Sequence, residues 1–143
     1  MLDRWLSDIQ VGRTFSLVAY DTHRLAGVAS LYLNPTSWIA HVGEIQVIVS
    51  PAYRGLRLAQ VLANEVLWVA NELGLAKMIA EMPNDADAAQ RVFRRFGFEP
   101  VTLLPGFALA TDGSPRDLLL MAYDRPGSET DTGRHLRLPW RRH

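Results

Sequence analysis

The chain has 143 residues, of which 48% are hydrophobic and 21% charged, a size and composition typical of one domain with one hydrophobic core. Its net charge of zero argues against a general nucleic-acid-binding protein, which would normally be basic. The absence of cysteine excludes disulfides, thiolate catalysis and cysteine-ligated zinc.

The sequence shows no segment for membrane insertion or export. No apolar stretch reaches the length of a membrane-spanning helix, and residues 1–10 lack the uninterrupted apolar core of a signal peptide. We therefore expect a cytoplasmic protein without a membrane partner. Trp5, Leu6 and Ile9 would fall on one side of a helix, which predicts the end of a helix within residues 1–10.

Three strands are expected next. Residues 14–20 alternate between apolar and polar positions, as a half-buried strand does. The polar residues 21–24 have the length of a hairpin loop, and residues 25–33 form a second strand with Gly27 as a candidate bulge. Residues 39–49 form the third and longest strand, so the three make an antiparallel meander.

The third strand runs directly into a turn and a helix. Its β-branched residues 47–49 end at Ser50, and the turn that follows contains Arg54 and Gly55. A helix that starts after such a turn presents unpaired backbone N–H groups and the positive end of its dipole. This combination predicts a phosphate-binding site.

The helix after the turn covers residues 57–73, because its apolar residues form one stripe and Gly74 lies at the C-cap position. The short apolar run at residues 77–81 has the length of a strand. A strand–helix–strand unit of this length is a right-handed crossover. The fourth strand should therefore lie parallel to the third.

The remaining elements are a second helix and a final antiparallel pair. Asn84 and Asp85 are expected to cap the second helix, and residues 98–104 pair with residues 117–123. From residue 124 onward Pro, Gly, Ser, Thr and charged residues dominate, with five arginines against three acidic residues. We predict one domain over residues 1–123 and a flexible basic tail over residues 124–143, with a partner-binding basic arm as the alternative for the tail.

The order β-β-β-α-β-α-β-β resembles the GNAT N-acetyltransferase superfamily from about residue 11 to residue 123. Residues 49–59, Val-x-Pro-x-Tyr-Arg-Gly-x-x-x-Ala, are similar to the Arg/Gln-x-x-Gly-x-Gly/Ala signature of that family. Residues 88–98, Ala-Ala-Gln-Arg-Val-Phe-Arg-Arg-Phe-Gly-Phe, resemble its helix that ends in Gly-Phe. The resemblance implies an α+β fold, with a mostly antiparallel sheet, one splayed parallel strand pair and helices on both faces. Without it, residues 49–59 read as an ordinary strand–turn–helix crossover.

The resemblance also implies acetyl-CoA as co-substrate, with no metal. The pantetheine would pair with the edge of the third strand, and the pyrophosphate would lie on the start of the helix. The residues assigned to this binding are Val47, Ile48, Val49, Arg54, Gly55, Leu56, Arg57, Leu58, Ala59 and Asn84.

Two residues depart from the family pattern at positions that matter for binding. Arg57 stands where the signature has its first glycine. We expect no backbone strain there, because a glycine in the first helical turn serves close approach to phosphate and not a positive φ. The Arg57 guanidinium is then available to the pyrophosphate or the 3′-phosphate. Ala86 stands where the family has a pantetheine-contacting asparagine.

Two further departures concern catalysis. Phe93 stands where the family commonly has a tyrosine that protonates the departing thiolate, and phenylalanine cannot donate a proton. Tyr123 or water is the substitute donor. Only about ten residues precede Thr14, where GNAT domains usually have a strand and one or two helices. Either the domain is trimmed or partial, or a partner subunit or the tail completes the acceptor site.

Glu44 is the candidate general base. It lies in the apolar third strand, about where many family members carry a catalytic glutamate. Burial raises the pKa of a carboxyl group, which suits it to deprotonating an ammonium. The alternative is a solvent-facing position on a one-sided sheet, because Glu44 and Gln46 share a face. His41 falls on the opposite face and is expected to be a loop or core residue.

These features predict an N-acetyltransferase in which a primary amine, on a small molecule or a peptide, attacks the acetyl-CoA thioester directly in a ternary complex. The alternative function is a catalytically silent GNAT-like module that binds acyl-CoA as a sensor or serves as an interaction domain. A nucleotide-binding module is disfavoured, because the turn lacks both glycine-rich phosphate-loop motifs. We expect no nucleic-acid partner, and a homodimer is one of the oligomeric states that the sequence allows.

Overall fold

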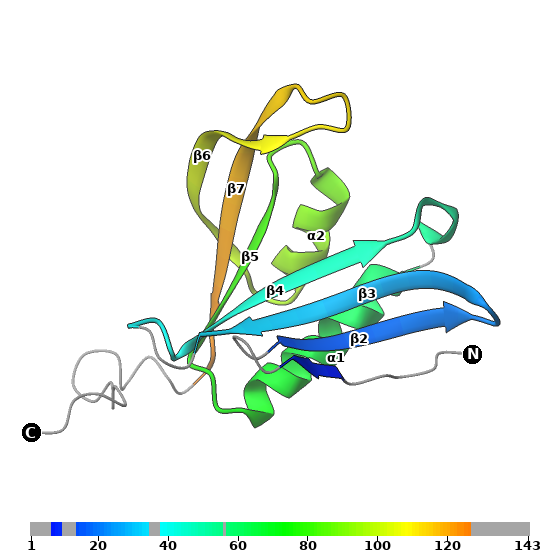
Figure 1. Cartoon of the computed structure of the whole chain (residues 1–143). Coiled ribbons are helices and arrows are strands. Elements are labelled where there is room, and N and C mark those ends of the chain that lie inside the picture. Colours follow the sequence, from blue (N-terminus) through cyan, green and yellow to red (C-terminus); the bar gives the residue numbers. More distant parts are fainter. Residues whose placement is uncertain (1–6, 10–13, 35–37, 56, 127–143) are drawn as a thin grey trace, which may run out of the picture.

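One mixed sheet with two helices makes up the described part of the chain (Figure 1). The computed structural model describes residues 7–9, 14–34, 38–55 and 57–126. In chain order the elements are β1 (Ser7–Ile9), β2 (Thr14–Asp21), β3 (Arg24–Leu33), β4 (Val42–Val49), a 3₁₀ helix (Pro51–Tyr53), α1 (Leu58–Glu72), β5 (Lys77–Pro83), α2 (Asp87–Arg95), β6 (Glu99–Leu109) and β7 (Pro115–Asp124). No described helix has the length and apolar character needed to cross a membrane.

The strands are arranged in the order β1-β2-β3-β4-β5-β7-β6. Strands β4 and β5 are parallel and the other neighbours are antiparallel, so the predicted meander, crossover and final pair are confirmed. The bulge predicted near Gly27 is also found, since the register shifts between Ala19 and Tyr20, next to the Ala19–Gly27 pair.

Several predicted boundaries are wrong. Residues 7–9 form strand β1 beside β2 and not the end of a helix, because three residues are too few to show a strand's alternation. Strand β4 begins at Val42 and not at residue 39, because the Val42 N–H donates to the Ile39 carbonyl (2.9 Å) and closes a turn.

The N-cap of α2 is Ala86, without a side-chain hydrogen bond, and not Asn84 or Asp85. Strand β6 continues to Leu109 instead of ending at residue 104. The tail beyond residue 126 lies outside the described residues.

Both described helices cover the same face of the sheet. Paired residues of neighbouring strands share a face, and the row Leu31, Ile45, Ala80 and Met121 crosses β3, β4, β5 and β7. All four side chains are buried, α1 packs over β3 and β4, and α2 contacts both α1 and β5. The mixed sheet with its one splayed parallel pair agrees with the predicted fold class, and the two described α-helices cover one of its faces. Periodicity identifies the apolar side of a helix but not the sheet face that it covers.

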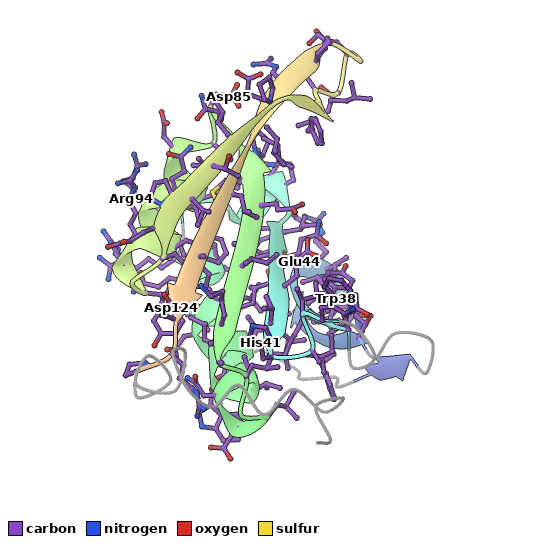
Figure 2. The ribbon with its side chains drawn as sticks, turned by 90° about the vertical axis from the view of Figure 1, so that its left-hand side faces the viewer. Trp38, His41, Glu44, Asp85, Arg94 and Asp124 are labelled. Carbon is purple, nitrogen blue, oxygen red and sulfur yellow. The ribbon has the colours of Figure 1, made fainter. Side chains whose placement is uncertain are left out.

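The opposite, open face lacks a helix in the described part of the chain. Its row Tyr32, Glu44, Ile79 and Ala122 crosses the same four strands, and none of these side chains is buried. In Figure 2, Arg94 of α2 lies toward the left of the molecule, and Glu44 and Trp38 lie toward the right.

Candidate active site

The parallel strands β4 and β5 separate part of the way along their length. They pair from Val42–Lys77 to Ile45–Ala80, whereas β4 continues to Val49 and β5 to Pro83. Figure 1 shows the two strands diverging beyond this point. The backbone of residues 46–49 thus faces a gap where a neighbouring strand would otherwise lie, and the predicted splayed pair is confirmed.

The gap opens into a groove of about 1060 Å³. One wall comes from the edge of β4, the turn and the first residues of α1, and the other comes from α2. The groove brings together eight of the predicted binding residues: Val47, Ile48, Val49, Arg54, Gly55, Arg57, Leu58 and Ala59. Leu56 lies outside the described residues. Asn84 does not line the groove, where Asp85 and Ala86 take its place.

The turn before α1 contains two residues with positive φ. Gly55 has φ +78° and Arg57 has φ +61°. The expectation that Arg57 causes no strain is therefore wrong. Arg57 is the N-cap residue of α1 and adopts a left-handed conformation, which disfavours a residue with a Cβ by about 1–2 kcal/mol. The glycine of the family signature would occupy this conformation without that penalty.

The start of α1 presents free backbone donors to the groove. The first intrahelical bond runs from the Val61 N–H to the Arg57 carbonyl (3.2 Å), and no side chain caps the helix. The N–H groups of residues 58–60 therefore have no acceptor within the helix. The helix dipole adds positive potential at the same place.

Four arginines and two aspartates set the charge of the groove. Arg54 and Arg57 come from the turn, Arg91 and Arg95 from α2, and the two carboxylates from Asp85 and Asp87. Arg95 Nη1 donates to Gln60 Oε1 (3.3 Å) and joins α2 to the first turn of α1. The excess of cations next to free N–H groups suits a polyanion such as a pyrophosphate. Sequence reasoning missed the α2 wall, although its arginine-rich, amphipathic sequence was visible.

The phosphate turn is held by the β2–β3 hairpin. Tyr53 Oη donates to Asp21 Oδ2 (2.8 Å), and this hydrogen bond raises the pKa of Tyr53 above its usual value. Ser50 donates from Oγ to the Leu25 carbonyl (2.8 Å) and from its backbone N–H to the Ala26 carbonyl (2.9 Å). These contacts fix the turn against a rigid pair of strands.

Glu44 lies on the open face immediately before the last paired position of β4. Burial raises the pKa of the Glu44 carboxyl above 4.5, and the charge of Glu81 adds to the increase. Glu81 lies on β5 two residues beyond Ile79, the partner of Glu44, and thus on the same face. Sequence reasoning missed Glu81, since the pairing of β4 with β5 is needed to bring the two carboxylates together.

The other candidates lie apart from Glu44. Tyr123 pairs with Met78 at the start of β5 and stacks on Phe98 (ring centroids 5.5 Å), so it lies on the helix-covered face. Phe93 is buried against Phe98 (5.0 Å). The His41 carbonyl accepts from the Ala76 and Lys77 N–H groups in the turn before β4. The structure does not bring Tyr123 and Glu44 together.

This chain resembles known proteins both in its sequence, through a family model, and in its fold, through solved structures. A model of the acetyltransferase (GNAT) family matches residues 2–98. An acetyltransferase of the GNAT family from Streptococcus pneumoniae aligns with TM-score 0.71 and 18% identity over 78% of this chain and 67% of that one. Ribosomal-protein-alanine N-acetyltransferase from Brucella melitensis aligns with TM-score 0.70 and 26% identity over 78% and 69%. The structure of yncA from Salmonella typhimurium, solved with its cofactor acetyl-CoA, aligns with TM-score 0.68 and 23% identity. The alignment covers 78% of this chain and 64% of that one. No curated protein sequence matches significantly.

Proposed function

The chain belongs to the acetyltransferase (GNAT) family, and on this basis we propose that it transfers an acetyl group from acetyl-CoA to a primary amine. The observation that carries the proposal is the groove between the β4 edge and α2, where β4 and β5 separate. It combines an unpaired strand edge, free N–H groups at a helix start and four arginines. The similarity to yncA, whose structure contains acetyl-CoA, supports the same co-substrate.

In this proposal each part of acetyl-CoA has its own contacts. The pyrophosphate accepts from the N–H groups at the start of α1 and from Arg54, while Arg57 reaches the pyrophosphate or the 3′-phosphate. The pantetheine lies along residues 47–49 and hydrogen-bonds the β4 edge as an added strand would. The thioester then lies near the point where the strands separate, next to Glu44.

The reaction proceeds by direct attack of the amine nitrogen on the thioester carbonyl carbon. Glu44 takes the proton from the acceptor ammonium, directly or through one water, because its raised pKa favours proton uptake. The nitrogen forms a tetrahedral intermediate and loses its second proton to water. The carbon–sulfur bond breaks, and coenzyme A leaves as a thiolate that takes up this proton from the water. Tyr123 is not assigned this proton transfer, since it lies on the other face of the sheet.

The acceptor approaches from the open face in this mechanism. The carboxylates of Glu44 and Glu81 attract a cationic group to the point where the strands separate. A small-molecule amine and the amino group of a peptide both meet this requirement. The Brucella relative, named for an alanine of a ribosomal protein, supports a peptide acceptor.

The proposal is tested first by binding. Acetyl-CoA is titrated calorimetrically against the wild type, Arg54→Glu and Arg94→Glu, the last being an exposed α2 arginine outside the groove. Charge-assisted hydrogen bonds contribute about 1.5–3 kcal/mol. Arg54→Glu should therefore weaken binding about tenfold or more, whereas Arg94→Glu should bind as the wild type does. Failure of the wild type to bind millimolar acetyl-CoA would overturn the proposal.

Coenzyme A release across a panel of amines then separates an enzyme from a sensor. Release that depends on both the amine and Glu44 supports the acetyltransferase. Tight binding without release from any amine would instead favour the catalytically silent acyl-CoA sensor.

A further inference from the structure

The two ends of the sheet differ greatly in what they expose. At one end lies β1, with three residues, and at the other lies β6, with eleven. In the fully described strand β6 no residue is buried. The pairing of β6 with β7 is not regular throughout, because the register shifts between Pro100 and Thr102 and between Leu104 and Ala108. Figure 1 shows β6 on the outside of the sheet, beside β7.

Beyond Glu99, all side chains of β6 except Thr102 are apolar. Residues 100–110 contain no charged residue. Four large apolar side chains are exposed: Val101 (60%), Leu103 (42%), Phe107 (70%) and Leu109 (73%). Natural sheets usually protect a long edge by charged side chains, by a covering element or by shortness. Proline and β-bulges also protect an edge, and β6 has Pro100, Pro105 and two register shifts against β7. Its apolar side chains nevertheless stay exposed.

We propose that β6 pairs edge to edge with β6 of a second copy of the chain about a twofold axis, forming one continuous sheet. A twofold contact must be complementary to itself, because each residue meets the same surface on the other copy. Like charges directly opposite each other would destabilise an antiparallel pair. Residues 100–110 contain no charged side chain, so pairing them with a second copy opposes no like charges in any register. The net charge of zero also adds no long-range repulsion between copies.

The size of the contact predicts a reversible dimer. A standard interface uses roughly 20–30 residues and about 800 Å² per partner, and the eleven residues of β6 supply about half of that. We therefore expect self-association at protein concentrations on the order of tens of micromolar. No residue of β6 lines the groove, so acetyl-CoA in the groove would not cover the proposed contact.

Sedimentation velocity of the full chain from about 1 to 300 µM provides the first test. The mass of the wild type should rise from 16.0 kDa toward twice that value. Leu103→Lys and Leu109→Lys place like charges across the twofold axis and should weaken association at least tenfold. Trp68→Lys, at another exposed apolar residue (61%) on α1, is the matched control and should associate as the wild type does.

The outcome contradicts the proposal if the wild type stays monomeric throughout, or if both β6 variants associate normally. A loss of association in Trp68→Lys alone would move the interface to α1 and also overturn it. Because all three positions are exposed, circular dichroism and melting should match the wild type, so an unfolded variant is recognised.

Cross-linking tests the register independently. The chain has no cysteine, so a single introduced thiol can form a disulfide only with another copy. Single cysteines at Thr102, Leu103 and Leu104 are oxidised mildly and compared with Trp68→Cys. The β6 position nearest the axis should cross-link fastest, and the control should not cross-link. No cross-linking from any of the three would overturn the proposed pairing.

Discussion

Arg57 holds the main chain in a conformation that favours glycine. Its φ of +61° disfavours a side chain by about 1–2 kcal/mol, while glycine costs about 0.4–1 kcal/mol in unfolded-state entropy. Arg57→Gly should therefore raise the free energy of unfolding by up to about 1 kcal/mol, a few degrees in melting temperature. Arg57→Ala keeps the Cβ and should show no such gain, and equal melting temperatures for the two variants would contradict the interpretation.

Binding distinguishes the two roles of Arg57. Both variants lose the guanidinium that lines the groove. If this group binds phosphate, both should bind acetyl-CoA more weakly than the wild type, even though only the glycine variant is more stable. A strained residue retained at a ligand site is typically retained for function.

Glu44 connects stability with catalysis through its pKa. The pKa of Glu44 in the folded state lies above its ordinary value of 4.5. At a pH between the ordinary and the raised pKa, the folded protein therefore binds more protons than the unfolded chain. Wild-type stability therefore falls as the pH rises from 4.5 through the raised pKa. Glu44→Gln should melt at a higher temperature than the wild type at pH 8, with the difference vanishing below pH 4.5. It should also reduce kcat by roughly 10²–10⁴-fold if Glu44 is the base.

The pH dependence of the rate supplies the control. The wild-type rate should rise with pH through the raised pKa of Glu44, to which the charge of Glu81 contributes. Glu81→Gln keeps the base but removes this repulsion, so the midpoint of the rise should move to lower pH. An unchanged kcat in Glu44→Gln would remove Glu44 from the mechanism.

At the scale of elements, Gly27 lets α1 lie close to the sheet. A Cβ at Gly27 would come within 2.9 Å of Leu62 Cδ1 and 3.0 Å of the Ile48 carbonyl oxygen. Gly27→Ala should lower the free energy of unfolding by about 1–3 kcal/mol. Because it pushes on the β4 edge and the first turns of α1, which wall the groove, it should also weaken acetyl-CoA binding.

Gly43→Ala is the matched comparison for this prediction. Its Cβ would meet only the ends of Leu75 and Leu31, at 2.7 and 2.8 Å, in the core and away from the groove walls. It should reduce stability yet leave acetyl-CoA affinity unchanged when both are measured by calorimetry. Equal losses of affinity in the two variants would show that general destabilisation is responsible.

Local elements could be predicted from the sequence, whereas contacts between distant elements could not. The apolar run at residues 47–49 and the Arg54–Gly55 turn predicted the groove wall, because a strand, a turn and a helix start are local features. The left-handed conformation of Arg57 could not be predicted, since a residue with a Cβ gives no sign of a positive φ. Glu81 and the shared face of α1 and α2 depend on strand pairing across the sheet, which periodicity within one segment does not contain.

At the scale of the whole molecule, the sheet consists of two parts joined over a short length. Strands β1–β4 with α1 and strands β5–β7 with α2 meet through four paired positions, Val42–Ile45 with Lys77–Ala80, and through the contact of α1 with α2. Acetyl-CoA in the groove would touch both parts and so hold them together. Ligand that binds only the folded state stabilises it by about 2.7 kcal/mol at 100 times its Kd.

Acetyl-CoA should therefore raise the melting temperature in a concentration-dependent way, by several degrees at saturating ligand. Hydrogen exchange should slow on both sides of the groove, at the start of α1 and at the start of α2, because the ligand suppresses separation of the two parts. Arg54→Glu should show both effects clearly reduced at the same ligand concentration, because its affinity is lower. Protection confined to the α1 side would mean that the ligand binds the phosphate turn without bridging the parts, and the two-walled groove would then not be the binding site.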